Sequence, residues 1–182
     1  ITAFHPGAMN HSHLNRVADC AKNLGNASSH FGIVAPDGRI GMWEHCHQFA
    51  EAGIPFIFDP GQGLPMFNGS ELLELVEMAS YLAVNDYEGE MLSQRTGLSM
   101  AKVAERVKAL IVTKGAEGAD IYFEGKCIAI PTVPASKVVD PTGCGARERQ
   151  QATLVVGART PNPGVVDFDA RRHQPRSNSS PV

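Results

Sequence analysis

Short apolar runs alternate with helix-patterned segments between residues 31 and 113, and this alternation constrains the fold more than any other feature. Each run spans four or five residues and ends at polar or turn-forming residues. The predicted strands are Phe31–Ala35, Ile54–Phe58, Tyr81–Val84 and Leu110–Thr113. Uninterrupted apolar strands are typical of parallel sheets buried on both faces. Their alternation with helices predicts an α/β domain with a mainly parallel central sheet flanked by helices.

The segments between these runs carry helical spacing and helix-terminating residues. We expect a first helix over Met42–Ala52, ended by Gly53, and a second that begins at a cap at Asn68 or Ser70 and includes Leu72, Leu75 and Ala79. A third helix is expected from Asp86 or the nearby acids through Leu92. A fourth is expected after Ser99, with Val103, Val107 and Leu110 on one face. A β-hairpin is predicted for Ala119–Phe123 and Lys126–Ile130 across Glu124-Gly125. In parallel sheets, ligands bind beyond the carboxyl ends of the strands. The loops at residues 59–65, 85–88, 113–118 and 140–145 follow predicted strands and are the candidate site.

The loop Asp140-Pro141-Thr142-Gly143-Cys144-Gly145 follows the short apolar run Lys137-Val138-Val139. Two glycines around a small residue leave backbone N–H groups uncovered, and such a nest can hold an anion. A plain glycine turn explains the same residues equally well. The loop alone leaves both interpretations open.

Asn85 and Glu88 follow a predicted strand with a spacing of three residues. An amide and a carboxylate so placed can hold hydrated Mg²⁺ beside phosphates. The same spacing also suits a helix cap, with Asn85 as N-cap and Glu88 in the first turn. Taken alone, the pattern favours the cap.

Thr113, Gly115 and Gly118 form a third pattern at the end of the next strand. Glycines at this spacing can lay backbone against a nucleotide, or they can serve a tight turn that needs positive φ. Neither a complete G-x-G-x-x-G nor a G-x-x-x-x-G-K-[ST] motif is present, which argues against a dinucleotide fold and a P-loop enzyme.

Taken in order, these three motifs resemble those of the ribokinase-like family, the PfkB carbohydrate kinases. Phe58-Asp59-Pro60 also resembles a strand-end segment of that family, and His5-Pro6-Gly7-Ala8-Met9-Asn10 is similar to members related to bacterial adenosine kinases. The resemblance covers residues 1–145. It implies a three-layer ribokinase-like domain, incomplete here, followed by a divergent tail at residues 146–182.

The resemblance implies ATP-dependent transfer of a phosphoryl group to a hydroxyl of a sugar or nucleoside, with ATP and Mg²⁺ as cofactors. Such chemistry is mostly positioning and charge neutralisation. The resemblance assigns the anion hole to Gly143, Cys144 and Gly145. It assigns the magnesium site to Asn85 and Glu88, and the nucleotide site to Thr113, Gly115 and Gly118.

The sequence departs from the family pattern after Gly145. The family places a catalytic aspartate next, whereas this chain has Ala146, and the family's N-terminal region with much of its acceptor site is largely missing. Loss of a general base typically costs about 10²–10⁴-fold in rate. We therefore expect impaired phosphotransfer. The alternatives are a non-enzymatic nucleotide-binding remnant and an unrelated α/β binding module.

The tail at residues 146–182 differs in composition from the body. Residues 1–146 contain four Arg and six Lys, whereas residues 147–182 contain six Arg and no Lys, among several prolines. Such a segment buries too little apolar surface to offset its ordering entropy, so we expect it to be mostly disordered. The abrupt change suggests a frameshifted reading of a gene that encoded an ordinary kinase C-terminus; a genuine extension is the alternative.

The remaining features are those of an ordinary globular protein. Net charge is −3, which gives no basic field for nucleic acid or a membrane surface. Without a signal peptide or an apolar run of membrane-spanning length, we expect a cytoplasmic protein with reduced cysteines. His45 and His47 would point apart on a helix and are not expected to bind a metal together. A homodimer is considered, although the sequence does not fix the oligomeric state.

Overall fold

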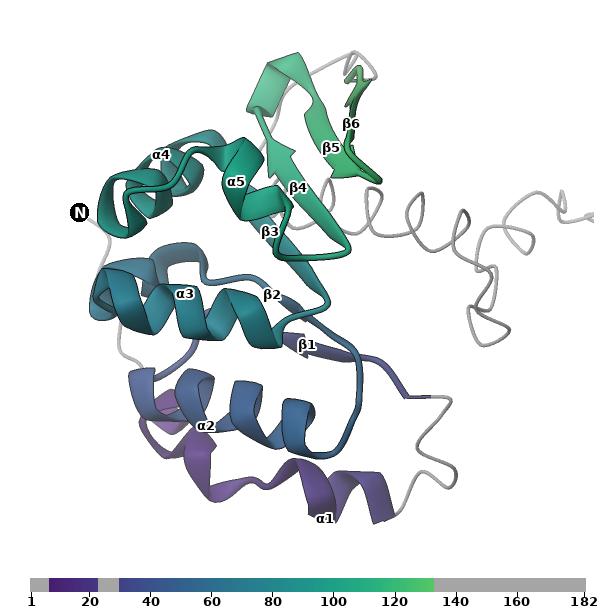
Figure 1. Cartoon of the computed structure of the whole chain (residues 1–182). Coiled ribbons are helices and arrows are strands. Elements are labelled where there is room, and N and C mark those ends of the chain that lie inside the picture. The colour runs from purple at the N-terminus through teal and green to yellow at the C-terminus, as the bar shows by residue number, and fades with distance from the viewer. Residues whose placement is uncertain (1–6, 23–29, 133–182) are drawn as a thin grey trace, which may run out of the picture.

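The computed structural model describes residues 7–22 and 30–132 (Figure 1). It contains the following elements in chain order: η1 (Gly7–Leu14), α1 (Val17–Lys22), β1 (Gly32–Val34), α2 (Arg39–Glu51), β2 (Phe56–Phe58), η3 (Gly61–Met66), α3 (Gly69–Met78), β3 (Tyr81–Asn85), α4 (Asp86–Thr96), α5 (Met100–Ala104), β4 (Ala109–Thr113), η4 (Gly115–Glu117), β5 (Ala119–Phe123) and β6 (Lys126–Ile130). The predictions for the loop at 140–145 and the tail at 146–182 concern residues outside this described part.

The six strands form one sheet in the order in which they occur along the chain. Strands β1 to β4 pair in parallel, and β4, β5 and β6 pair antiparallel as a meander. Helices connect the parallel strands, as such crossovers require. The predicted α/β class with a mainly parallel sheet is therefore confirmed.

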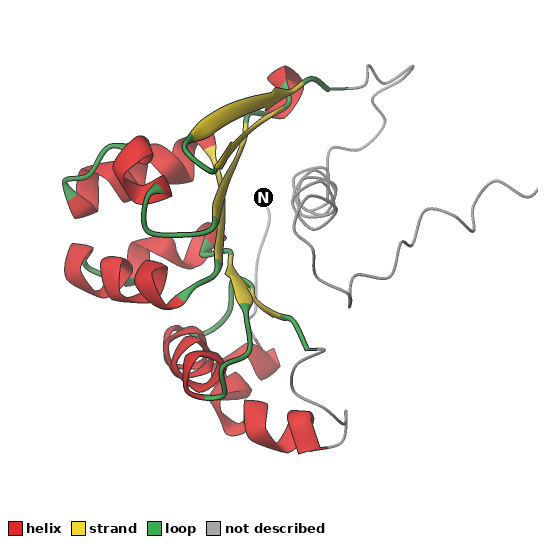
Figure 2. Ribbon diagram, turned by 45° about the vertical axis from the view of Figure 1, so that its right-hand side comes forward, coloured by secondary structure: helices red, strands yellow, loops and turns green. Residues whose placement is uncertain are grey.

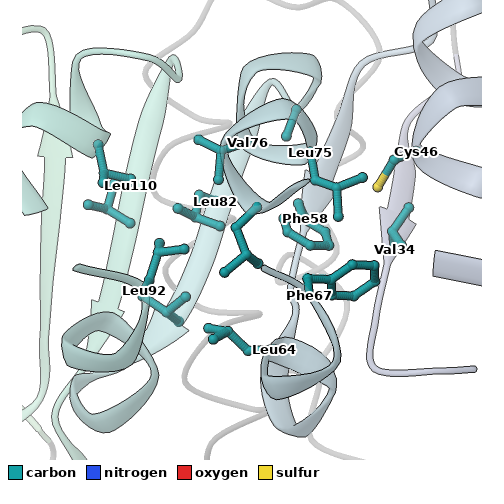
Figure 3. Close-up of a cluster of buried hydrophobic side chains, with 14 of the residues drawn as sticks. Val34, Cys46, Phe58, Leu64, Phe67, Leu75, Val76, Leu82, Leu92 and Leu110 are labelled. Atoms are coloured by element: carbon teal, nitrogen blue, oxygen red, sulfur yellow. The ribbon is translucent and has the colours of Figure 1, made fainter. Parts of the chain in front are cut away.

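The main core lies between the sheet and its helices. Phe58, Leu82 and Leu110 point from successive strands toward this side and are fully buried (Figure 3). Helices α2, α3, α4 and α5 lie on one side of the sheet (Figure 2). Alternate residues point to the other face, where Ile57 and Ile111 belong to a smaller buried cluster. The described residues thus contain one of the two helical layers that we expected.

Several predicted boundaries shift in the structure. Helix α4 begins directly after Asn85 and continues past Leu92 to Thr96, where Gly97 adopts φ 70° and ends it. The helix after Ser99 ends at Ala104, so its predicted continuation through Val107 to Leu110 is wrong. Leu110 belongs to β4, which pairs along its whole length with β3 and β5.

Two other differences concern the N-terminal half. Helix α2 starts at Arg39, three residues earlier than predicted, and β1 spans only Gly32–Val34. The helical segments η1, α1, η3 and η4 were not predicted. No helix among residues 7–22 and 30–132 is long and apolar enough to cross a membrane.

Candidate functional site

Asn85 and Thr113 lie side by side at the carboxyl ends of two adjacent parallel strands. They are register partners, the last pair of the β3–β4 ladder. Neighbouring strands are about 4.8 Å apart, so the residues that follow each strand share one edge of the sheet. This register brings the predicted Asn85–Glu88 and Thr113–Gly118 motifs together.

Asn85 and Glu88 form a capping box at the start of α4. The Asn85 side-chain oxygen accepts a hydrogen bond from the Glu88 backbone N–H at 2.7 Å, and the Asn85 backbone N–H donates to Glu88 Oε2 at 2.8 Å. The capping interpretation is therefore observed. The Glu88 side chain is buried at 9% exposure, which places a carboxylate at the sheet edge.

A tight turn follows β4 and leads into β5. Gly115 and Gly118 have φ of 55° and 93°, so the turn needs the conformational freedom of glycine at both positions. The Lys114 backbone N–H donates to the Gly118 carbonyl at 2.7 Å, and the Glu117 N–H donates to the Lys114 carbonyl at 3.1 Å. Thr113 itself is buried at 2% exposure. The interpretation of these glycines as a tight turn that needs positive φ is therefore observed.

Charged and polar side chains flank this turn on the hairpin. Lys114 Nζ lies 2.7 Å from Asp120 Oδ2. This hydrogen bond to Asp120 raises the pKa of Lys114 above its ordinary value. On the same strand, burial raises the pKa of Tyr122, with a smaller contribution from Cys127 opposite it.

A cavity of about 390 Å³ opens at the same edge of the sheet, beside the loops that follow β1 and β2. Its polar lining residues include Asn10, Asp37 and Gln62. Gly61, at φ 46°, packs so closely on Pro36 that a side chain there would overlap the proline ring. The close approach of these two loops fixes one wall of the cavity.

A larger cavity, of about 580 Å³, lies at the opposite end of β4. Lys108, which precedes β4, and Lys126, which begins β6, are among its lining residues. It contains none of the predicted site residues. Size therefore does not identify the site, and the carboxyl edge is favoured because the motifs meet there.

The structure brings together five of the eight predicted site residues: Asn85, Glu88, Thr113, Gly115 and Gly118. The other three, Gly143, Cys144 and Gly145, and the adjacent Ala146, lie outside the described residues. The contribution of η1 to the cavity and the Lys114–Asp120 pair were not predicted. The signal for that pair was opposite charges on the two sides of a glycine turn.

The histidines and cysteines have other surroundings. His45 Nε2 contacts the Asn15 carbonyl at 2.9 Å, whereas His47 Nε2 contacts Glu74 Oε1 at 3.0 Å. The two rings therefore have separate partners, as their spacing predicts. Within the described part of the chain, no three His, Cys, Asp or Glu side chains gather to hold a metal ion. Cys46 is a free buried thiol whose pKa burial raises to about 12.

A comparison with protein-family models matches residues 32–145 to the pfkB family carbohydrate kinases. The matched segment includes the three candidate site motifs and Phe58-Asp59-Pro60, and it covers more than half of the chain. The chain belongs to the pfkB carbohydrate kinase family.

Several relatives of this chain are nucleoside kinases. A nucleoside kinase of Methanocaldococcus jannaschii is 47% identical over 88 residues, which are 48% of this chain and 29% of the relative. The nucleoside kinase of Burkholderia thailandensis, whose structure was determined with inosine, superposes with a TM-score of 0.73 at 46% identity and covers 87% of this chain and 50% of that one.

The structure of the M. jannaschii nucleoside kinase, described as an archaeal member of the ribokinase family, superposes with a TM-score of 0.72 at 33% identity. The match covers 86% of this chain and 50% of that one. The predicted ribokinase-like fold is confirmed. The chain spans about half the length of these two structural relatives, and its alignments with curated relatives cover less than a third of theirs.

Proposed function

We propose that this chain is a nucleoside-kinase-derived domain that binds MgATP at the carboxyl edge of its sheet and is impaired in phosphoryl transfer. The observation that carries the proposal is the register of Asn85 with Thr113, which places the Asn85–Glu88 and Thr113–Gly118 motifs at one edge of the sheet. A structure of the B. thailandensis relative is described as its complex with ADP-inosine, which supports a nucleotide and a nucleoside as the ligands.

The residues at this edge fit a hydrated Mg²⁺. In such sites Mg²⁺ keeps several waters and takes one or two carboxylates beside substrate phosphates. Glu88 supplies a buried carboxylate, and its capping-box hydrogen bond with Asn85 fixes the direction of that group. Asn85 and Glu88 would hold the ion through its waters. When bound, the ion would neutralise charge on the transferred phosphoryl group.

The protein's own contribution is the positioning of backbone and side chains. The turn from Thr113 to Gly118 would carry the nucleotide, and Gly143, Cys144 and Gly145 would supply N–H donors to the phosphoryl group. The cavity beside Asp37 and Gln62 is the candidate acceptor pocket, because it opens along the same edge as Asn85. A sugar or nucleoside hydroxyl there would face the nucleotide.

Ala146 limits the reaction, because alanine has no group that accepts a proton. The family places an aspartate at that position, and loss of a general base costs about 10²–10⁴-fold in rate. We therefore expect MgATP binding with little or no phosphotransfer. A non-enzymatic nucleotide-binding remnant is the limiting case of this proposal.

The test is a titration with MgATP followed by thermal unfolding. Binding to the folded state raises stability by RT ln(1 + [L]/Kd), so the midpoint should rise with ligand concentration. The Gly143→Val variant should lose the response, because a branched side chain blocks the approach of the backbone. A second assay would follow phosphate transfer to inosine. No stabilisation by MgATP up to millimolar concentration would refute the nucleotide site, and turnover at the rate of full-length relatives would refute the impairment.

A further inference from the structure

Lys114 closes the turn at residues 113–118 through its backbone hydrogen bonds. It lies between Thr113 and Gly115, its N–H donates to the Gly118 carbonyl at 2.7 Å, and its own carbonyl accepts from Glu117 at 3.1 Å. Any movement of Lys114 therefore moves two of the hydrogen bonds that shape the turn.

The Lys114 side chain is tied to the neighbouring strand. Its ammonium lies 2.7 Å from the Asp120 carboxylate, and the two side chains are 32% and 19% exposed. Asp120 is the register partner of Val112 in the β4–β5 ladder, so its backbone is fixed by the sheet. The ion pair thus connects the start of a glycine turn to a rigid element.

The other end of the turn is fixed by backbone packing. A side chain at Gly118 would overlap the Ile130 carbonyl oxygen and would lie 3.0 Å from the Thr132 nitrogen. Thr132 Oγ1 also donates to the Gly115 carbonyl at 3.2 Å. The turn is therefore held by the end of β6 on one side and by the Lys114–Asp120 pair on the other.

We propose that Lys114 and Asp120 are positioning residues for nucleotide binding, a role that rests on the proposed function of the Thr113–Gly118 turn. Two glycines at positive φ leave this backbone free to adopt other conformations once its ties are lost. Binding of a ligand to a mobile loop is weakened by the free energy needed to order the loop, whereas a loop that is already fixed binds without that loss. The pair strengthens nucleotide binding without touching the nucleotide.

The first experiment measures the dissociation constant for MgATP in paired variants. Asp120→Asn and Lys114→Met should each weaken binding by roughly two- to fivefold, the range that the measured strengths of such ion pairs imply. The charge-swapped double variant, Lys114→Asp with Asp120→Lys, should recover most of the affinity. The matched control is Lys102→Met, which removes the exposed Lys102–Glu105 pair on α5 and should leave the constant unchanged.

The second experiment needs no nucleotide. Amide hydrogen exchange of Glu117 and Gly118, which both donate hydrogen bonds within the turn, should be faster in Asp120→Asn and unchanged in Lys102→Met. Unchanged exchange in Asp120→Asn would overturn the proposal, because the pair would not then fix the turn. Faster exchange with unchanged affinity would also overturn it, since the turn would not then serve the nucleotide.

The two experiments separate failure of the proposal from failure of the proposed function. If the unaltered chain shows no response to MgATP, the nucleotide site itself is refuted and the positioning role falls with it. The exchange measurement would then still report whether the ion pair fixes the turn.

Discussion

Asn85 and Thr113 are register partners at the last step of the parallel ladder between β3 and β4. Asn85 caps the start of helix α4 with its side chain, and Thr113 leads into the glycine turn. Their adjacency means that a helix N-terminus and an exposed loop backbone face the same space beyond the sheet. Both features favour an anion, which is why this edge is the candidate site.

The first prediction concerns stability in alkali. Burial raises the pKa of the Cys46 thiol from its ordinary value of 9.0 to about 12. Above pH 9 the unfolded chain loses this proton while the folded chain keeps it, so the free energy of unfolding should fall as pH rises toward 12. The slope from this group approaches about 1.4 kcal/mol per pH unit. Urea unfolding at several pH values between 7 and 10.5 measures it.

The control for this prediction is Cys46→Ala. The variant should be less stable at pH 7, because it leaves a small cavity in the core. Its stability should nevertheless fall less steeply above pH 9, since the buried thiol is gone. Identical slopes in the two proteins would show that Cys46 does not cause the alkaline loss.

The second prediction compares two glycines at positive φ on the same hairpin. Gly118 packs against the Ile130 carbonyl, whereas Gly125, at φ 72°, has open space around the position of a side chain. Gly125→Ala should lower the free energy of unfolding by about 1 kcal/mol from backbone strain alone. Gly118→Ala adds a steric overlap with backbone and should cost at least twice as much. Urea unfolding of both variants checks the difference, and equal losses would contradict the close packing of Gly118.

The hairpin was predictable residue by residue. Its strands are joined by the two-residue turn Glu124-Gly125, and the observed φ values of 50° and 72° match the turn type that fixes hairpin register. Local chemistry sufficed there, as it did for the cap formed by Asn85. By contrast, apolar spacing placed Leu110 both in a helix and in a strand, and only the pairing of β4 with two neighbours decides between them.

Tertiary contact explains the elements that were missed. The segment η1 has no helical periodicity, and it lies against the start of α2 because Gly38 and Gly41 allow close approach to Met9 and Ser12. The site was predictable where it depends on neighbours in sequence, as in Asn85 and Glu88. Its cavity was not, because the cavity is built from loops that follow different strands.

The third prediction concerns the coding DNA. The match to the pfkB family ends at residue 145, the position where the basic residues change from mixed Lys and Arg to Arg alone. We expect one of the other two reading frames after the Gly145 codon to encode an aspartate followed by an apolar, helix-patterned stretch. Sequencing and translation of this region decide the matter. If neither frame contains such a stretch, residues 146–182 are a genuine extension of the protein.

The last prediction separates the capping role of Asn85 from its proposed role in the nucleotide site. The chain holds a second capping box of the same type, in which Asn68 accepts from the Glu71 N–H at 2.9 Å at the start of α3. Asn68→Ala and Asn85→Ala should each lower the free energy of unfolding by about 1 kcal/mol, because each removes one N-cap hydrogen bond. Only Asn85→Ala should also weaken MgATP binding, measured by titration under conditions where both variants are fully folded. Equal weakening in the two variants would mean that binding follows helix stability, and no weakening in either would leave Asn85 with the cap as its sole role.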